Sequence, residues 1–323
     1  SVLSNGCAYV GSVTDVSQVG DLLRSGTSNP VRFGESVAVS DTGTVMAVGA
    51  RDYNRGAVFI YDRNGSEWVY RYRVSAPNSS YDDFGLSIDL SSDGSTLIVG
   101  TADTEVAVYD LSDTGSTERG NRTETDGGYS GDVAISSDGN RIAVGYGYYS
   151  SNSVRVYEWV SDRWQQQGAA ISGSYNTEFG HALSFSDDGT VLAVGAALDT
   201  SSSGSTGVVT VYVWDGSAWV QRGTDLIGES AGDSFGESVS LSSDGETLAI
   251  GAPYDDASGS NAGHVRVFTW DGSAWVQRGD DLDGEGTDDQ FGASVSLTGD
   301  GKTLAVGAPQ NTNSGLARGH TRL

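Results

Sequence analysis

Cysteine is almost absent from this chain of 323 residues, because Cys7 is the only one. A single cysteine cannot form an intrachain disulfide, so the fold depends on packing, and Cys7 is either a free thiol or a link to another chain. No apolar run approaches the roughly 18–20 residues that cross a bilayer. No segment keeps the i, i+3, i+4 apolar spacing of an amphipathic helix over three turns. We therefore expect a chain essentially without helices and without membrane insertion.

Positive charge is the second shortage. Lys and Arg together number 18 against 43 Asp and Glu, which gives a formal net charge of −25, and Lys302 is the only lysine. Such a charge repels phosphate backbones and anionic membranes, so we expect no nucleic-acid partner. It favours basic proteins or cations as partners. The alternative is that the acidic surface only keeps the chain soluble.

Glycine is plentiful, at 46 residues, and the stretches between glycine-rich points are rich in Val, Ile, Leu, Tyr and Trp. This composition is typical of an all-β protein. The stretches also repeat, and alignment on their central turns gives six starts separated by 51, 45, 50, 56 and 56 residues. A period of this size with four strands per repeat is typical of a β-propeller blade. The repeats start at Phe33, Phe84, Tyr129, Phe179, Phe235 and Phe291.

Residues 235–290 show the repeat most clearly. Ser243-Asp244-Gly245 separates an alternating stretch from a nearly continuous apolar one, a long loop follows, and Asp271-Gly272 marks a hairpin. We name the four predicted strands A, B, C and D. They are expected at 238–242, 246–253, 264–270 and 274–279.

Residues 1–32 fit strands C and D of a repeat, whereas 291–309 fit strands A and B with no clear C and D behind them. We therefore predict one propeller domain over 1–323, most simply with six blades. The ring is then closed by N-terminal strands that complete the last blade, which removes a free sheet edge. However, residues 319–322 copy 263–266, the beginning of another strand C. They either displace the N-terminal residues in the last blade or belong to a longer array, so seven blades are the alternative.

Two motifs recur in frame: Phe-Gly before strand A and Gly-Ala-Pro after strand B. Both are complete in the repeats at Phe235 and Phe291, and only the proline is missing in those at Phe33 and Phe179, whereas Tyr129-Ser130 replaces Phe-Gly. The pattern resembles the FG-GAP repeat of integrin α-subunit propellers and of many large secreted proteins, over nearly the whole chain. The resemblance implies a propeller that serves as an extracellular or cell-surface interaction module. It implies no particular ligand, because propellers carry many unrelated sites.

Propellers of that family commonly bind Ca²⁺ in the A–B turn through a D-x-D-x-D-G pattern, because this cation needs six to eight oxygen ligands. The corresponding turns here hold one or two carboxylates each. We therefore expect no cofactor and no metal in these turns, and any Ca²⁺ site would lie elsewhere. The aspartates are better explained as turn residues before a glycine of positive φ. They are Asp93, Asp138, Asp244 and Asp300.

Binding residues are expected in the B–C and D–A connections, which alternating strand direction places together on one face. The B–C loops vary in length and content, whereas the A–B and C–D turns are short and nearly identical. Carboxylates beside aromatic rings suit a basic protein surface or a sugar. The alternative is that these residues only form turns and pack between blades. The candidates are Asp52, Tyr53, Tyr146, Tyr148, Tyr149, Asp199, Tyr254, Asp255 and Asp256.

Catalysis finds little support in the sequence. His181, His264 and His320 lie in different repeats, and the last two share one repeat position, which favours a structural role. No phosphate-binding loop, nucleophile elbow or zinc-protease motif is present. The tryptophans recur in frame on strands C and D, which predicts packing between blades. We therefore predict no catalytic residues and a partner-binding or self-associating module, with a glycan-binding propeller second and a polysaccharide-active enzyme third.

Three sequons, at Asn64, Asn78 and Asn121, fit N-glycosylation. The chain begins without the charged and apolar regions of a signal peptide, which is then either absent or already removed. Together with the family resemblance, the sequons favour an extracellular or cell-surface location.

Overall fold

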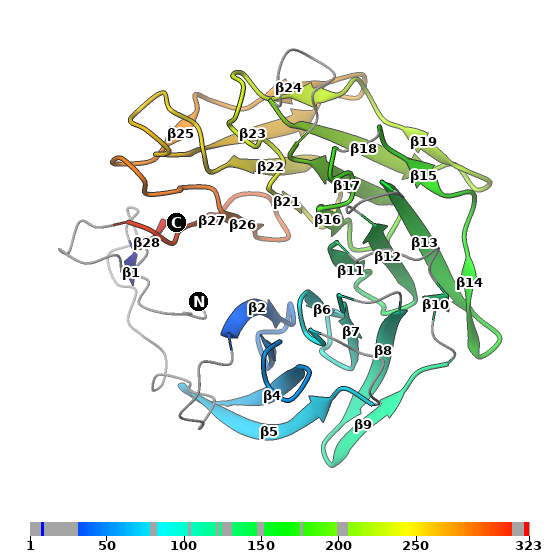
Figure 1. Cartoon of the computed structure of the whole chain (residues 1–323). Helices are drawn as coiled ribbons and strands as arrows, with labels where there is room; N and C mark the ends of the chain where they lie inside the picture. Colours follow the sequence, from blue (N-terminus) through cyan, green and yellow to red (C-terminus); the bar gives the residue numbers. More distant parts are fainter. Residues whose placement is uncertain are drawn as a thin grey trace.

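The computed structural model shows an all-β protein whose described residues contain strands and no helix (Figure 1). The described part of the chain accordingly offers no helix that is long and apolar enough to cross a membrane. The predicted absence of helices is confirmed for these residues. The structure describes residues 8–9, 32–77, 83–102, 105–120, 123–124, 131–146, 152–174, 177–198, 206–311 and 320–322.

Six sheets follow one another along the described chain and are arranged round a common centre, with the first strand of each sheet innermost (Figure 1). In the first five, each of the four main strands pairs antiparallel with the next. The first two sheets consist of β2 (Phe33–Val39), β3 (Val45–Ala50), β4 (Ala57–Asn64) and β5 (Glu67–Ser75), and of β6 (Ile88–Leu90), β7 (Thr96–Val99), β8 (Glu105–Ser112) and β9 (Gly115–Glu118) with β10 (Thr123–Glu124). The next two consist of β11 (Val133–Ile135), β12 (Arg141–Tyr146), β13 (Ser153–Val160) and β14 (Arg163–Gln166) with β15 (Ile171–Ser172), and of β16 (Ala182–Phe185), β17 (Val191–Ala196), β18 (Val208–Trp214) and β19 (Trp219–Gln221) with β20 (Leu226–Ile227). The last two consist of β21 (Ser238–Leu241), β22 (Thr247–Ala252), β23 (His264–Trp270) and β24 (Trp275–Gln277) with β25 (Leu282–Asp283), and of β26 (Ser294–Leu297), β27 (Leu304–Ala308), β28 (His320–Arg322) and β1 (Ala8–Tyr9).

The predicted fold class, a propeller of four-stranded sheets, is confirmed. In the repeat at Phe235, the strands β21 to β24 begin and end within two residues of the predicted A, B, C and D. Strand D is shorter than expected, because the chain bends at Gly279, whose φ is +78°. It then returns to the same sheet as β25, which pairs with β23.

Strand B of each repeat is the core of its sheet. β3, β17 and β22 are buried along their whole length. Each has a neighbouring strand on both sides within its sheet. β17 and β22 also have an adjacent sheet on both faces. A strand in that position reads as a continuous apolar run rather than an alternating one, which explains the apolar stretch at 246–253.

The A–B turns have the predicted geometry. In the second sheet, Ser91 Oγ and the backbone N–H of Ser95 both donate to Asp93 Oδ1 at 2.8 Å, and Gly94 has φ +71°. The same arrangement recurs around Asp138, Asp188, Asp244 and Asp300. Burial is the largest single effect on the pKa of Asp93 and raises it, but the hydrogen bonds together outweigh burial and lower the pKa. The interpretation of these aspartates as turn residues is confirmed.

The tryptophans of strands C and D pack between sheets, as predicted. Trp164 Nε1 donates to the carbonyl of Arg119 in the preceding sheet at 3.1 Å, and Trp275 Nε1 donates to that of Arg222 at 3.0 Å. The Arg222 guanidinium also lies 4.7 Å from the ring centroid of Trp270. Each Trp pair therefore fastens one sheet to the sheet before it.

The last sheet differs from the simplest prediction. Its third position is taken by β28, which pairs antiparallel with β27, and β1 lies outside β28 in a parallel pairing of Ala8 with His320 and Tyr9 with Thr321. Residues 320–322 thus begin a strand C as their sequence suggests, and β1 is not strand C of this sheet. The local reason is that β28 follows β27 in the chain as β23 follows β22. Residues 10–31, with the rest of the predicted closing strands, lie outside the described residues, as does Cys7, and the choice between six and seven blades stays a prediction.

Candidate binding face and axial cavity

The D–A and B–C connections of neighbouring sheets meet on one face, as the strand directions predict. The backbone N–H of Phe84 donates to the carbonyl of Arg55 at 3.1 Å. Phe235 and Phe291 make the equivalent hydrogen bonds, to Thr206 at 3.2 Å and to Ala262 at 2.9 Å. These three D–A connections are therefore tied to the B–C loop of the preceding sheet. We call this side of the molecule the loop face.

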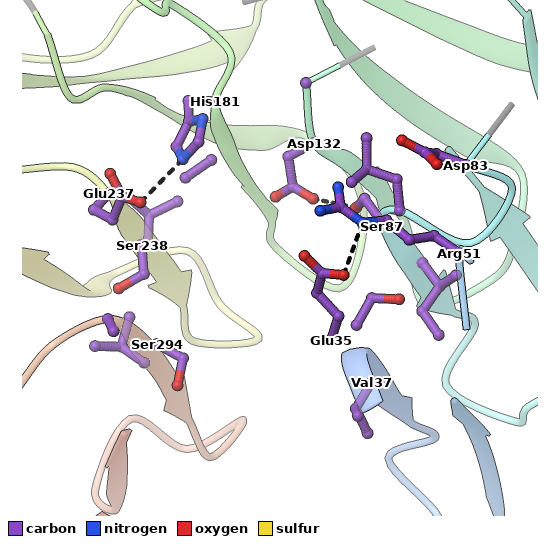
Figure 2. A pocket seen from close by; sticks show the side chains of 18 of the residues that line it. Glu35, Val37, Arg51, Asp83, Ser87, Asp132, His181, Glu237, Ser238 and Ser294 are labelled. Atoms are coloured by element: carbon purple, nitrogen blue, oxygen red, sulfur yellow. Dashed lines mark hydrogen bonds and ion pairs between the residues drawn. The ribbon is translucent and has the colours of Figure 1, made fainter. Parts of the chain in front are cut away.

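A cavity of about 780 Å³ lies on the axis at the loop face, between the beginnings of the inner strands (Figure 2). Carboxylates, hydroxyls and short apolar side chains alternate round its wall because each inner strand contributes two or three consecutive residues. Two cationic side chains, Arg51 and His181, also line it. The carboxylates are Glu35, Asp83, Asp132 and Glu237, and the hydroxyls are Ser36, Ser87, Ser238 and Ser294.

Asp132 is the most enclosed carboxylate of the cavity, and it links three sheets. Its Oδ1 accepts a short hydrogen bond from Ser87 Oγ and one from its neighbour Val133 N at 2.9 Å. Its Oδ2 accepts from Leu183 N in the next sheet at 2.9 Å. Burial raises the pKa of Asp132, and these hydrogen bonds counter only part of the effect.

His181 lies between two glutamates, Glu178 and Glu237, and Figure 2 shows its contact with Glu237. Its Nε2 is 3.3 Å from Glu237 Oε1, and its Nδ1 is 4.0 Å from Glu178 Oε2. Burial lowers the pKa of His181, but the hydrogen bond and charge of Glu237, with the charges of Glu178 and Asp132, outweigh burial and raise it. Burial also raises the pKa of Glu178.

A second ion pair stands on the opposite wall, where Arg51 Nε lies 2.8 Å from Glu35 Oε2 (Figure 2). Glu35 also lies 3.4 Å from Arg32. Burial raises the pKa of Glu35 more than the charge of Arg32 lowers it. With four carboxylates against one guanidinium and one imidazole, the described wall of the cavity carries a net negative charge while its carboxylates are ionised.

The sequence-predicted residues are only partly brought together on the loop face. Tyr254 is 41 % exposed, and its neighbour Asp256 is exposed and accepts a hydrogen bond from Asn261 N at 2.8 Å. Asp52 is exposed and lies 3.2 Å from Arg32. Tyr53 is half-buried, because its ring packs edge-on against Phe59 and its hydroxyl accepts from Arg73 at 2.7 Å.

Two predicted residues are buried instead. Tyr146 is 2 % exposed and packs in the core with Tyr157 and Trp164, so its prediction as a surface residue is wrong. It ends the buried strand β12, whose sequence continues the apolar run. Asp255 is 4 % exposed, lies 3.3 Å from His264 Nδ1, and accepts from Ala257 N at 2.9 Å, so it shapes its own loop. Tyr148, Tyr149 and Asp199 lie outside the described residues, as do Asn78 and Asn121, whereas Asn64 is exposed at the end of β4.

Comparison with known proteins agrees with this architecture. The family model of the FG-GAP repeat matches residues 228–268. A chain of the Kuenenia stuttgartiensis hydrazine synthase has a similar structure, with a TM-score of 0.63 and 16 % identity over 89 % of this chain and 77 % of that one. At that identity the likeness shows the fold alone. No curated protein matches the sequence.

The chain is a β-propeller that contains an FG-GAP repeat. In this propeller the two glycines of the motif touch. The N–H of Gly236 donates to the carbonyl of Gly251 at 3.0 Å, and equivalent bonds join Gly180 to Gly195 and Gly292 to Gly307. A Cβ on Gly251 would lie 2.0 Å from the carbonyl oxygen of Gly292 in the next sheet. The motif therefore marks the place where neighbouring sheets approach most closely.

The cavity residues of the propeller were missed by sequence reasoning, although a signal exists. In the third repeat the N–H of Gly131 donates to the carbonyl of Gly145 at 2.6 Å, so Gly131 takes the place of the motif glycine and the match of Tyr129-Ser130 to Phe-Gly is one residue out of register. The residue that follows the motif glycine or its counterpart is Glu35, Leu86, Asp132, His181, Glu237 or Ala293. Within an otherwise repetitive frame, this one position changes its chemistry from copy to copy. All six of these residues except Leu86 and Ala293 are ionisable, and all six line the cavity.

Proposed function

We propose that this propeller is a non-catalytic protein-interaction module that binds a basic segment of a partner protein across the loop face. The observation that carries the proposal is the axial cavity at that face, whose described wall holds more carboxylates than cationic groups. Propellers with FG-GAP repeats are typical of extracellular proteins, and we place this module outside the cell or at its surface on that ground.

The chemistry of the cavity suits a guanidinium or ammonium group. Glu237 has one cationic neighbour at hydrogen-bond distance, His181, and Glu35 has two, Arg32 and Arg51. Both carboxylates can accept further bonds with their remaining lone pairs. The serine hydroxyls of the wall can accept from the other N–H groups of the same side chain. The net charge of −25 steers a basic partner toward the molecule before contact.

A glycan-binding propeller is the second candidate. Its support is the exposed ring of Tyr254 beside the exposed carboxylate of Asp256, a combination that can stack on a sugar ring and accept from its hydroxyls. A polysaccharide-active enzyme is the third, and turnover of a polysaccharide by the purified chain would replace both binding hypotheses.

The proposal is tested with a labelled peptide that carries three arginines separated by Ser and Gly, and with the same peptide in which citrulline replaces arginine. We expect saturable binding of the arginine peptide by fluorescence anisotropy and no binding of the citrulline peptide. Glu237→Gln should weaken binding by about tenfold, because a charged pairing is replaced by a neutral one. Asp113→Asn, which removes one exposed carboxylate from the C–D turn between β8 and β9 on the opposite face, should leave it unchanged.

An equal loss with Asp113→Asn and Glu237→Gln would show that only the overall charge attracts the peptide, and the site would be wrong. Absence of peptide binding, together with glycan-array binding that is lost in Tyr254→Ala, would favour the second candidate.

A further inference from the structure

The D–A connection places two side chains together at the axial cavity. In the fourth sheet the backbone N–H of His181 donates to the carbonyl of Glu178 at 2.9 Å, and in the fifth that of Glu237 donates to Ser234 at 3.1 Å. The residue that begins each turn has positive φ, +56° at Glu178 and +55° at Ser234. The first and fourth residues of the turn are thereby held close to each other.

In two sheets these paired positions hold opposite charges. In the first sheet they are Arg32 and Glu35, 3.4 Å apart, and Arg51 adds a second guanidinium to the same carboxylate. Arginine is always protonated near neutral pH, so this positive charge is fixed. In the fourth sheet the same positions hold Glu178 and His181. Among the described residues of the cavity wall, the imidazole of His181 is the group that gains or loses a positive charge near neutral pH.

Both ring nitrogens of His181 face carboxylates. Nε2 lies 3.3 Å from Glu237 Oε1 in the next sheet, and Nδ1 lies 4.0 Å from Glu178 Oε2. A neutral imidazole has one N–H and donates to one of these carboxylates, whereas an imidazolium has two and pairs with both. Asp132, at the start of β11 in the preceding sheet, is the third titratable group that faces His181. Protonation of His181 therefore occupies carboxylates that a bound cation would use.

The wall that carries His181 is built from the third, fourth and fifth sheets. Leu183 N donates to Asp132 Oδ2, and Leu241 N donates to Ser184 Oγ, both at 2.9 Å, so neighbouring inner strands are held together. The side chains of His181, Glu178 and Glu237 are half-buried. They are accessible to a ligand in the cavity, yet enclosed enough that solvent screens their charges only in part.

We propose that His181 makes the binding of a cationic partner in the axial cavity depend on pH: the neutral imidazole permits binding, and the imidazolium opposes it. This inference rests on the proposed function, because it concerns the same cavity. The guanidinium of the partner donates to Glu237 and Glu178 in place of the second N–H of the imidazolium. The proton that leaves His181 passes to the solvent, so binding at neutral pH is accompanied by proton release.

The direction of the pH dependence follows from the groups around the imidazole. Burial lowers the pKa of His181, but the hydrogen bond and charge of Glu237, with the charges of Glu178 and Asp132, outweigh burial and raise the pKa above its ordinary 6.5. As pH falls, His181 therefore gains its positive charge already above pH 6.5. Burial raises the pKa of Asp132 and of Glu178, so these carboxylates are neutralised next. Each step makes the cavity less negative, and the affinity for a cation decreases throughout.

The test measures binding of the arginine peptide at pH 6, 7 and 8 and constant ionic strength, with the peptide acetylated at its amino terminus so that nothing in it titrates in this range. One linked proton changes affinity by up to about tenfold per pH unit. We expect the unsubstituted chain to bind at least about fivefold more tightly at pH 8 than at pH 6. His181→Gln, a neutral replacement, should bind with less than about twofold change between these pH values. His181→Arg, which keeps a positive charge, should bind weakly at all three.

Calorimetry in phosphate and in Tris at pH 7 counts the protons released, because the two buffers differ in their heat of ionisation. We expect release of up to about one proton per bound peptide from the unsubstituted chain and none from His181→Gln. Asp113→Asn, on the opposite face, should keep the pH dependence of the unsubstituted chain. Circular dichroism confirms that the variants fold, and proton release by the unsubstituted chain tests the proposal without any substitution.

Equal affinity of the unsubstituted chain at pH 6 and pH 8, or a pH dependence that persists in His181→Gln, would overturn this inference and leave the proposed function in place. Absence of peptide binding at all three pH values would overturn the proposed function and this inference with it. The two failures are therefore distinguishable.

Discussion

The glycine that ends strand B has a normal φ and is required for a different reason, the closeness of the next sheet. Gly251 is the clearest example, because an added Cβ would meet the backbone carbonyl of Gly292, which cannot swing away as a side chain could. We expect Gly251→Ala to lower the free energy of unfolding by about 1–3 kcal/mol, the usual cost of overpacking. Chemical denaturation measures it.

Gly115→Ala is the matched control, since nothing lies within 4 Å of its Cβ position and its φ is not positive. It should change the free energy of unfolding by less than about 0.5 kcal/mol. If both substitutions changed the free energy of unfolding by a similar amount, the effect would come from the conformational freedom of glycine in the unfolded chain and not from the contact between sheets.

Asp89 makes the free energy of unfolding depend on pH, although other repeats have an uncharged residue at the same position. Burial raises the pKa of Asp89 to about 7, against an ordinary value of 3.8, although the N–H groups of Ile135 and Leu90 donate to it. Between these two pH values the folded chain holds a proton that the unfolded chain has released. The stability contributed by this group is therefore lost as pH rises from about 4 to 7.

Uncharged serines occupy the same repeat position in two other sheets. Ser184 Oγ accepts from Leu241 N and Ser240 Oγ accepts from Leu297 N, both at 2.9 Å. We therefore expect Asp89→Ser to be more stable than the unsubstituted chain at pH 8 and to lose this advantage at pH 4.5, as measured by thermal melts. Asp113→Ser, at an exposed carboxylate in the turn between β8 and β9 of the same sheet, should leave the pH profile parallel to that of the unsubstituted chain. Identical pH profiles for Asp89→Ser and the unsubstituted chain would contradict this account.

The A–B turns hold together through hydrogen bonds within the chain. Each turn aspartate already accepts a hydroxyl and a backbone N–H on Oδ1, as Asp244 does from Ser242 at 2.6 Å and Glu246 N at 3.0 Å. We expect that excess Ca²⁺ and a chelator give melting temperatures within about 2 °C of each other. A rise of many degrees with Ca²⁺ would show that the acidic loops hold a metal.

The arginine at the end of strand D and the Trp pair of the following sheet together hold two neighbouring sheets in contact. Arg278, which has no such Trp contact among the described residues, is the control for Arg222. Arg222 has an ion pair with Glu246 at 2.5 Å, a hydrogen bond to Gly245 and the ring of Trp270, whereas Arg278 has the hydrogen bond to Gly301. We expect Arg222→Ala to cost about 1–3 kcal/mol of unfolding free energy. Arg278→Ala should cost less than about 0.5 kcal/mol. Equal costs in denaturation experiments would mean that the Trp contact does not stabilise the sheets.

The strands and turns could be predicted from sequence, because their residue types favour the same structure in each repeat and recur at the same positions. Strand B of the fifth sheet is apolar throughout and is buried throughout, and Asp244-Gly245 turns as its residue types require. The cavity was missed because Glu237 and His181 are 56 residues apart and meet only when the inner strands surround the axis. Tyr146 was misplaced because the end of a buried strand and the beginning of an exposed loop are adjacent in sequence.

The two ends of the described chain are where the regular architecture changes. Elsewhere each sheet lies between two others, and the contact is fixed by glycines, by tryptophans and by inner-strand hydrogen bonds such as that from Leu297 N to Ser240 at 2.9 Å. The sheet of β26 to β28 receives these contacts from the fifth sheet. Among the described residues, Gly307 has only Ser294 of its own sheet near its Cβ position, whereas Gly251 meets the backbone of the next sheet.

The last sheet should therefore open most readily. β27 and β22 have nearly the same sequence, LAVGA and LAIGA, so their intrinsic amide exchange rates are similar. β22 is fully buried and pairs with β23 over six residues and with β21 over four. In the described part of the chain, β27 is half-buried at three of its five residues and pairs with β28 over three. In hydrogen exchange followed by mass spectrometry, we expect the peptide of β27 to exchange at least tenfold faster than that of β22. Equal protection of the two strands without peptide would mean that the last sheet is covered as fully as the fifth.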